Sequence, residues 1–276
     1  MPTKTGKAYA NFYKNDLAVN QSSNTGVDAT TRNIQDGAGN NTSISLSDDV
    51  LQVQPQNDDT TGALLVKTKG GTTILSADTS NQRILAGATQ LAVNTQYAYF
   101  GCSALNTTGA ASFNADTHYA LPFAGANSFG YVAANVAMGT STTSSFNDTN
   151  PATSLTISTS ASDIVTTYWY VVDNITIDSV IWLQGADDAT GDTTSAHLMS
   201  YDINTANGST SGDLSSGAVV ADGSNITNAG REQIYYQTMT VQSANVDAGK
   251  VILFTFASDT NNSDYTIQAT VKYHIR

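Results

Sequence analysis

The end of the chain reads Thr266-Ile267-Gln268-Ala269-Thr270-Val271-Lys272-Tyr273-His274-Ile275. Apolar and polar side chains alternate here at every second position, which is the period of a β-strand with one buried face. Because the alternation continues to the last residues, we expect the C-terminus to be held in a sheet. This stretch predicts that the C-terminal part of the chain is built from strands.

Further candidate strands precede it. Residues 168–172 form a continuous apolar run, as expected for a strand buried on both faces, and residues 251–256 are apolar on both faces as well. Shorter candidates lie at 155–157, 197–201 and 234–237. In the next candidate, alternation predicts that the following residues share one face: Ile175, Ile177, Ser179, Ile181 and Leu183.

The polar residues also favour strands. Between Arg83 and Arg231 the chain has no lysine, arginine or glutamate but eleven aspartates, and its single glutamate is Glu232. Glu, Lys and Arg usually fill exposed helix faces, so their absence disfavours helices. Many strands, glycine-bearing turns and no helical periodicity are typical of a sandwich or jelly roll. We therefore expect an all-β fold with a jelly-roll-like β-sandwich head at residues 96–276.

Charge and hydropathy exclude several classes of partner. The net charge is −12 and the isoelectric point is about 4.3, so a nucleic acid or an anionic membrane would be repelled. We find no apolar run of about 18 residues, which predicts no membrane span. The N-terminus lacks the apolar core of a secretory signal, which disfavours export.

The first residues differ from the rest of the chain. Lys4, Lys7 and Lys14 against Asp16 give this segment a local charge of +2 (three minus one), ahead of an acidic body. We expect residues 1–23 to be an attachment arm that docks onto another protein. A terminus without a role is the alternative.

Residues 24–95 contain short strands separated by turn signals. Asp36-Gly37 and Gly39-Asn40 mark one turn, and Gly70-Gly71 separates two apolar runs that form a predicted hairpin, 64–67 and 72–75. Each strand has too few apolar residues for one copy to bury a stable core. Several copies wound around a common axis could do so, and this segment is therefore predicted to be a β shaft that drives oligomerisation.

The sequence offers little catalytic chemistry. Cys102 is the only cysteine, so an intrachain disulfide is excluded; a small buried residue is the favoured interpretation and a catalytic thiol the alternative. His118, His197 and His274 have no metal-ligand spacing. His197 is predicted to be a partly buried strand residue, although a triad that uses His197 or His118 stays open. Nucleophile-elbow, P-loop and dinucleotide motifs are absent.

Three further sites are open on sequence grounds. Asp187, Asp188 and Asp192 could hold calcium through oxygen ligands, or form a solvated turn. Glycoside hydrolysis needs two carboxylates, for which Glu232 and the many aspartates are candidates. Four aromatic residues could stack on sugar or belong to the core: Tyr168, Trp169, Tyr170 and Trp182.

Several strings resemble virion proteins of tailed bacteriophages, notably those of marine phages. Residues 24–47, from Asn24-Thr25-Gly26 to Ser45-Leu46-Ser47, are similar to a segment near the N-termini of such proteins, and residues 74–81 resemble the β repeats of fibre shafts. Residues 169–178, 212–215 and 272–275 are similar to their C-terminal head domains. The resemblance implies trimers, an N-terminal attachment segment, a short intertwined shaft and a jelly-roll-like head. It implies no catalytic residues and no cofactor.

The leading hypothesis is therefore a structural protein at the virion surface: a homotrimeric fibre or spike on the tail or capsid, joined to other virion proteins by its arm and able to contact host glycans. One alternative is a capsid decoration protein that stabilises the head. A second is a polysaccharide-degrading spike, and a third, a free lectin or adhesin, is disfavoured by the missing export signal. The receptor and the role of residues 97–156 stay open.

Overall fold

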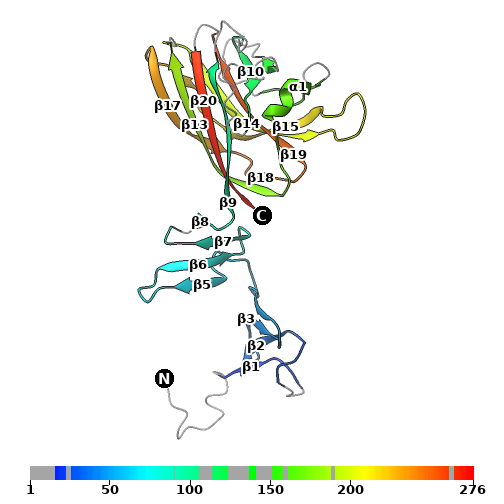
Figure 1. Ribbon diagram of the computed structural model, residues 1–276. Coiled ribbons are helices and arrows are strands. Elements are labelled where there is room, and N and C mark those ends of the chain that lie inside the picture. Colours follow the sequence, from blue (N-terminus) through cyan, green and yellow to red (C-terminus); the bar gives the residue numbers. More distant parts are fainter. Residues whose placement is uncertain are drawn as a thin grey trace. The chain divides into compact units, whose positions relative to one another are not determined.

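The computed structural model describes residues 16–22, 26–89, 91–105, 114–123, 137–140, 151–157, 161–187, 190–260 and 264–276. The fold is all-β, with two small antiparallel sheets and one large curled antiparallel sheet (Figure 1). Helical structure in these ranges is limited to α1 (Ala161–Ile164) and the 3-10 turn η4 (Val165–Thr167). The chain forms two compact units, residues 1–94 and 95–276.

The N-terminal unit holds the two small sheets, each a meander of sequential strands. The first sheet contains β1 (Leu17–Val19), β2 (Arg32–Asp36), β3 (Asn41–Leu46) and β4 (Leu51–Val53); the second contains β5 (Leu64–Lys67), β6 (Thr73–Asp78), β7 (Arg83–Ala86) and β8 (Leu91–Ala92). The predicted hairpin is confirmed as β5 and β6, and Gly71 in its turn has a φ of +92° that favours glycine.

The predicted attachment arm is only partly described. Residues 1–15 and 23 lie outside the described residues. The remainder includes β1, which pairs antiparallel with β2, Leu17 opposite Asp36 and Val19 opposite Ile34. The end of the predicted arm thus belongs to the first sheet, because β2 offers it an open edge for backbone hydrogen bonds.

The described residues of the N-terminal unit form no apolar core. In its described residues no hydrophobic side chain is buried, and the buried residues are Ser45, Ser76 and Asp78. Twelve large hydrophobic side chains are exposed instead: Leu17, Val27, Ile44, Val50, Leu51, Leu64, Leu65, Val66, Ile74, Ile84, Leu91 and Val93. A single copy therefore leaves most of the apolar surface of this unit in water.

The C-terminal unit is built on one large sheet. Its main strands are β9 (Thr95–Leu105), β10 (Thr117–Ala120), β11 (Ala137–Thr140), β13 (Ile175–Asp187), β14 (Thr193–Ile203), β15 (Leu214–Asp222), β17 (Glu232–Val241), β19 (Lys250–Ser258) and β20 (Asp264–Ile275). Three two-residue strands pair at the side: β12 (Trp169–Tyr170), β16 (Ile226–Thr227) and β18 (Asn245–Val246).

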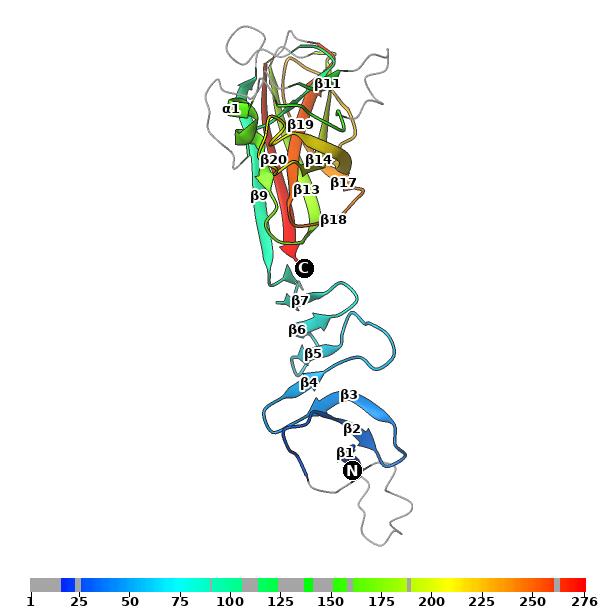
Figure 2. The ribbon, with the colours of Figure 1, turned by 90° about the vertical axis from the view of Figure 1, so that its right-hand side faces the viewer.

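The sheet curls so that β9, at one of its ends, contacts the segment that follows β10. The strand order is β11-β10-β19-β14-β15-β17-β13-β20-β9. A bridge between Phe100 and Phe123 joins the β9 end to the β10 end, and the Gly101 amide donates to the Pro122 carbonyl at 3.0 Å. The sheet thus has two parts, the four strands β9-β20-β13-β17 and the five strands β11-β10-β19-β14-β15, which Figures 1 and 2 show wrapped around a common interior.

Two apolar clusters hold this unit together. The main cluster lies between the two halves, where Trp182 of β13 meets Phe256 of β19 and Phe100 of β9 stacks on Phe254. The second lies on the outward side of β14 and β19, where Met199, Tyr201 and Leu253 are fully buried. It is covered by a segment that includes Leu155, Ile157, Ile164 and Tyr168.

Three predictions made from local pattern are wrong. Of the run 168–172, only β12 is a strand, and Tyr170 and Val172 are 50% and 75% exposed, so the run is not buried on both faces. Residues 155–157 form only an isolated bridge, Leu155 to Leu214. Both segments are short. β12 pairs with only two residues of β19, and Leu155 and Ile157 pack against the second cluster, so tertiary contacts override the strand propensity of these residues.

The third error concerns β13. Ile177 is opposite Tyr273 while Ser179 is opposite Lys272, so Asp178 is an extra residue in a β-bulge. The bulge reverses the alternation: Ile175 and Ile177 are buried, but after it Val180 and Trp182 are buried instead. Ile181 and Leu183, predicted to share the face of Ile175, therefore point to the opposite side.

Candidate functional site

The outward side of β9, β20, β13 and β17, which we name the outer face, exposes apolar side chains. Its most exposed members lie on its two flanking strands: Tyr97, Tyr99, Ile234 and Tyr236, with exposed fractions of 52%, 50%, 81% and 67%. The half-buried Ile181 and Leu183 of β13 lie between these strands. Neighbouring strands lie side by side over this half of the sheet (Figure 2).

Strand register arranges the outer face in rows. The rows are Tyr97, Lys272 and Ser179; Tyr99, Thr270, Ile181 and Thr238; Gly101, Gln268, Leu183 and Tyr236; and Thr266, Gly185 and Ile234. Lys272 is the one charged residue in these four rows. The chain has 23 acidic residues, so these four rows differ from the rest of its surface in having no carboxylates.

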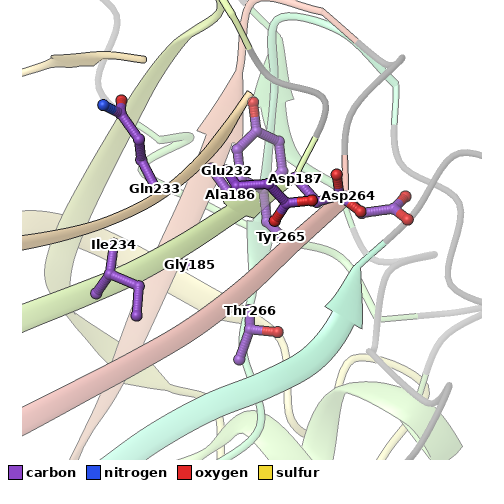
Figure 3. A pocket seen from close by; sticks show the side chains of 9 residues that line it. All are labelled: Gly185, Ala186, Asp187, Glu232, Gln233, Ile234, Asp264, Tyr265 and Thr266. Carbon is purple, nitrogen blue, oxygen red and sulfur yellow. The ribbon is translucent and has the colours of Figure 1, made fainter. Parts of the chain in front are cut away.

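The next row, at the end of the outer face, is acidic. Asp187 is opposite Glu232 on one side and opposite Asp264 on the other. These residues line an open hollow of about 610 Å³ together with Gly185, Ala186, Gln233, Ile234, Tyr265 and Thr266. Figure 3 shows the Asp187 and Asp264 carboxylates next to each other above Thr266. Glu232, the only glutamate, thus shares a row with two aspartates, which sequence reasoning did not foresee because the three positions are far apart in the chain.

Asp187 and Asp192 of the predicted calcium turn have different surroundings. Asp187 lies in the hollow, whereas Asp192 accepts hydrogen bonds from Thr260 Oγ1 at 2.8 Å and from the Tyr265 hydroxyl at 3.3 Å. Asp188 lies outside the described residues. Burial raises the pKa of Asp259, which lies near Asp192 and Asp116. Across the described ranges, no three His, Cys, Asp or Glu side chains are grouped as metal ligands.

Two of the three histidines lie together. His197 lies on β14 and is 5% exposed, where the sequence predicted a partly buried strand residue. Its ring lies edge-on to that of His118, with the ring centroids 5.2 Å apart. His197 Nε2 is 3.3 Å from Asp222 Oδ1. Burial nevertheless lowers the pKa of His197 to about 4 and raises that of Asp222, so the neutral imidazole is favoured. His274 is apart from them and contacts Asp178.

The four aromatic residues do not form a platform. Trp182 and Trp169 are in the main cluster, Trp169 stacked on Phe123 at 5.8 Å. The Tyr168 hydroxyl donates to the Gly212 carbonyl, and only Tyr170 is half-exposed. The core interpretation therefore holds for the two tryptophans, and no shared sugar-stacking surface is formed by this set.

Cys102 is a buried strand residue. It lies on β9 opposite Ile267 and belongs to the main cluster. Burial raises the pKa of its thiol to about 12, so the nucleophilic thiolate is suppressed at neutral pH. This agrees with the small-residue interpretation and argues against a catalytic thiol.

Comparisons with known proteins give no family. No protein-family model matches the chain, and no curated protein matches its sequence. In the described part of the chain, no helix has the length and apolar composition to cross a membrane.

Proposed function

We propose that this chain is a bacteriophage virion structural protein that forms a homotrimeric fibre or spike at the virion surface. The observation that carries the proposal is the N-terminal unit, in which twelve large hydrophobic side chains are exposed and none of the described ones is buried. Burying apolar surface is worth about 25 cal/mol per Å², and sheets this small are not stable alone. Copies that intertwine their small sheets would supply the missing core.

We further propose that the C-terminal unit is a jelly-roll-like head. In support, consecutive strands alternate between the two parts of the sheet. β9, β13, β17 and β20 lie in one part, and β10 with β11, β14 with β15, and β19 lie in the other. Such switching between two packed halves is typical of Greek-key sandwiches. The resemblance of residues 169–178 and 272–275 to phage head domains is in accord with this.

The role we propose is binding and structural rather than enzymatic. Three joined heads convert weak contacts with host glycans into useful avidity, which requires no reaction. Residues 1–23 would join the protein to its virion partners. The alternative of a polysaccharide-degrading spike has one feature in its favour, the carboxylate row Glu232, Asp187 and Asp264 in an open hollow.

The first test is the mass of the purified full-length protein by light scattering at micromolar concentration. We expect three times the 28.9 kDa chain. A monomer would overturn the fibre proposal, since the N-terminal sheets would then be stable without partners.

Two further measurements separate the alternatives. Antibody labelling of intact virions on tails supports the fibre, whereas labelling confined to the capsid shell favours a decoration protein. New reducing ends on host polysaccharide, abolished by Glu232→Gln but not by Asp173→Asn, would replace the binding role with a degrading one.

A further inference from the structure

We propose that the outer face is the surface through which the heads of neighbouring copies pack against each other. This inference rests on the proposed oligomer and names the surface that the head contributes to it. The occupant is a second copy of this chain, presenting its own β9, β20, β13 and β17. Three features of the described residues support it, and the first two are independent of the N-terminal unit.

The first feature is exposure without cover. The outward side of the other half, at β14 and β19, is already closed by the segment that holds Leu155, Ile157 and Ile164. The outer face has no such cover among the described residues, and Ile234 and Tyr236 are 81% and 67% exposed. Four strands at ~4.8 Å spacing are about 19 Å wide, and four rows that are two residues apart span about 20 Å at ~3.4 Å rise per residue, so the area is roughly 400 Å². Within this area the apolar side chains lie on β9, β13 and β17, and β20 contributes threonine, glutamine and one lysine. A group of exposed apolar side chains on a nearly uncharged area is typical of an interaction surface.

The second feature is charge. Each copy carries a net charge of −12, so two copies repel unless the surfaces that meet are free of carboxylates. The outer face meets this requirement over four rows, in which Lys272 is the one charge. The acidic row of Asp187, Glu232 and Asp264 marks its limit, where carboxylates can stay hydrated at the rim.

The third feature is covalent connection. Only Val93 and Asn94 separate β8 of the N-terminal unit from β9 of the head. Contacts between copies in the N-terminal units therefore bring the β9 strands of those copies to a high effective concentration. Tyr97 and Tyr99 of the outer face are on this first strand, so the strand that directly follows the N-terminal unit in the chain carries exposed aromatic side chains.

The bulge at Asp178 determines which side chains of β13 belong to the outer face. Without it, the side chains of Ile181 and Leu183 would enter the interior of the head and those of Val180 and Trp182 would leave it. The extra residue places two aliphatic side chains at the centre of the outer face, flanked by Thr270 and Gln268 on β20.

The test measures burial of the outer face in the full-length protein with an introduced thiol. Thr238→Cys lies in the outer face and changes little volume. Val172→Cys, at a residue that is 75% exposed and is not part of these rows, is the matched control. The native Cys102 is buried with a raised thiol pKa, so unchanged protein provides the blank. The rate of maleimide labelling and the mass by light scattering are measured on the same samples.

We expect a multimer in which Thr238→Cys reacts at about a tenth of the rate of Val172→Cys or less, because labelling requires opening of the interface. A multimer in which both thiols react equally fast would overturn this inference and leave the oligomer intact. A monomer would overturn the proposed function together with the inference. Tyr236→Asp provides a second readout: it should lower the thermal midpoint of the multimer, while Val172→Asp leaves it unchanged, and equal midpoints would also contradict the interface.

Discussion

Nδ1 of His274 lies 3.0 Å from Oδ1 of Asp178, the residue that has no register partner between β13 and β20. The histidine ring is 2% exposed and its Nε2 atom is buried without a hydrogen-bond partner in the structure. Asp178 is therefore the hydrogen-bond partner of Nδ1, and Nδ1 is the one nitrogen of this buried ring that has a partner. The contact lies at the bulge that decides which residues of β13 face outward.

Asp178→Ala should destabilise the head by about 1–3 kcal/mol, because it leaves both ring nitrogens of His274 buried and unpaired. Urea unfolding followed by fluorescence of the buried Trp169 and Trp182 measures the free energy. Asp173→Ala, at an exposed position, is the control and should change it little. Equal unfolding free energies for the two variants would show that the pair does not hold the bulge.

His197 predicts a dependence of stability on pH. Burial lowers its pKa to about 4 in the folded state, from an ordinary value of 6.5 in the unfolded chain. Between these values the unfolded state binds more protons, so the contribution of His197 to stability is complete above pH 6.5 and is lost as the pH falls towards 4. From pH 7 to pH 5 the loss should be roughly 2 kcal/mol.

The measurement compares unchanged protein with His197→Gln at both pH values. Asp222, whose pKa burial raises, and the other acidic groups are present in both proteins, so their contributions largely cancel in the difference. The variant should lose about 2 kcal/mol less than the unchanged protein between pH 7 and pH 5. Parallel losses would mean that His197 is already protonated in the folded state at pH 5.

Gly217→Ala should destabilise the head through overpacking. A Cβ atom at this position would lie 2.5 Å from Cε1 of Tyr201 and 2.7 Å from Cα of Thr153, and the latter is backbone that cannot rotate away. We expect a loss of about 1–3 kcal/mol in thermal or urea unfolding. Gly70→Ala, where the nearest atom would be 3.8 Å away, is the matched control. A Gly217→Ala protein as stable as this control would mean that residues 151–157 do not pack against β15.

The Cys102 thiol should be unreactive in the folded protein. With a pKa raised to about 12 and a position in the main cluster, it presents almost no thiolate and no access. A colorimetric thiol assay should detect less than a tenth of a thiol per chain in native buffer, about one after denaturation, and the same pattern from pH 6 to pH 9. Full reaction in native buffer would return the catalytic-thiol hypothesis to consideration.

Much of the architecture follows from local pattern. The alternation of residues 266–275 predicted β20, and the glycines at 70 and 71 predicted the β5–β6 hairpin, because strand pleat and turn geometry depend on neighbouring residues alone. The sparse apolar residues of segment 24–95 likewise predicted a unit without its own core, which the exposed side chains of β5 show directly.

The candidate site was much less accessible from sequence. The outer face joins residues from β9, β13, β17 and β20. Its identity depends on the register between residues up to 175 positions apart in the chain, as for Tyr97 and Lys272 (272 minus 97). Asp187, Glu232 and Asp264 form a row for the same reason, so a search for acidic motifs along the chain found only the Asp187, Asp188 and Asp192 turn.

The sequence by itself determined that this protein is made of strands, that its surface is acidic and that its N-terminal part cannot bury a core alone. Composition and period-2 alternation carry that information residue by residue. Only the tertiary structure decided which side of β13 faces out, because one bulged residue, Asp178, reverses every following side chain. Pairing with β17 and β20, together with the contact between Asp178 and His274, sets the place of that bulge, and such long-range contacts leave no local periodic signal in the chain.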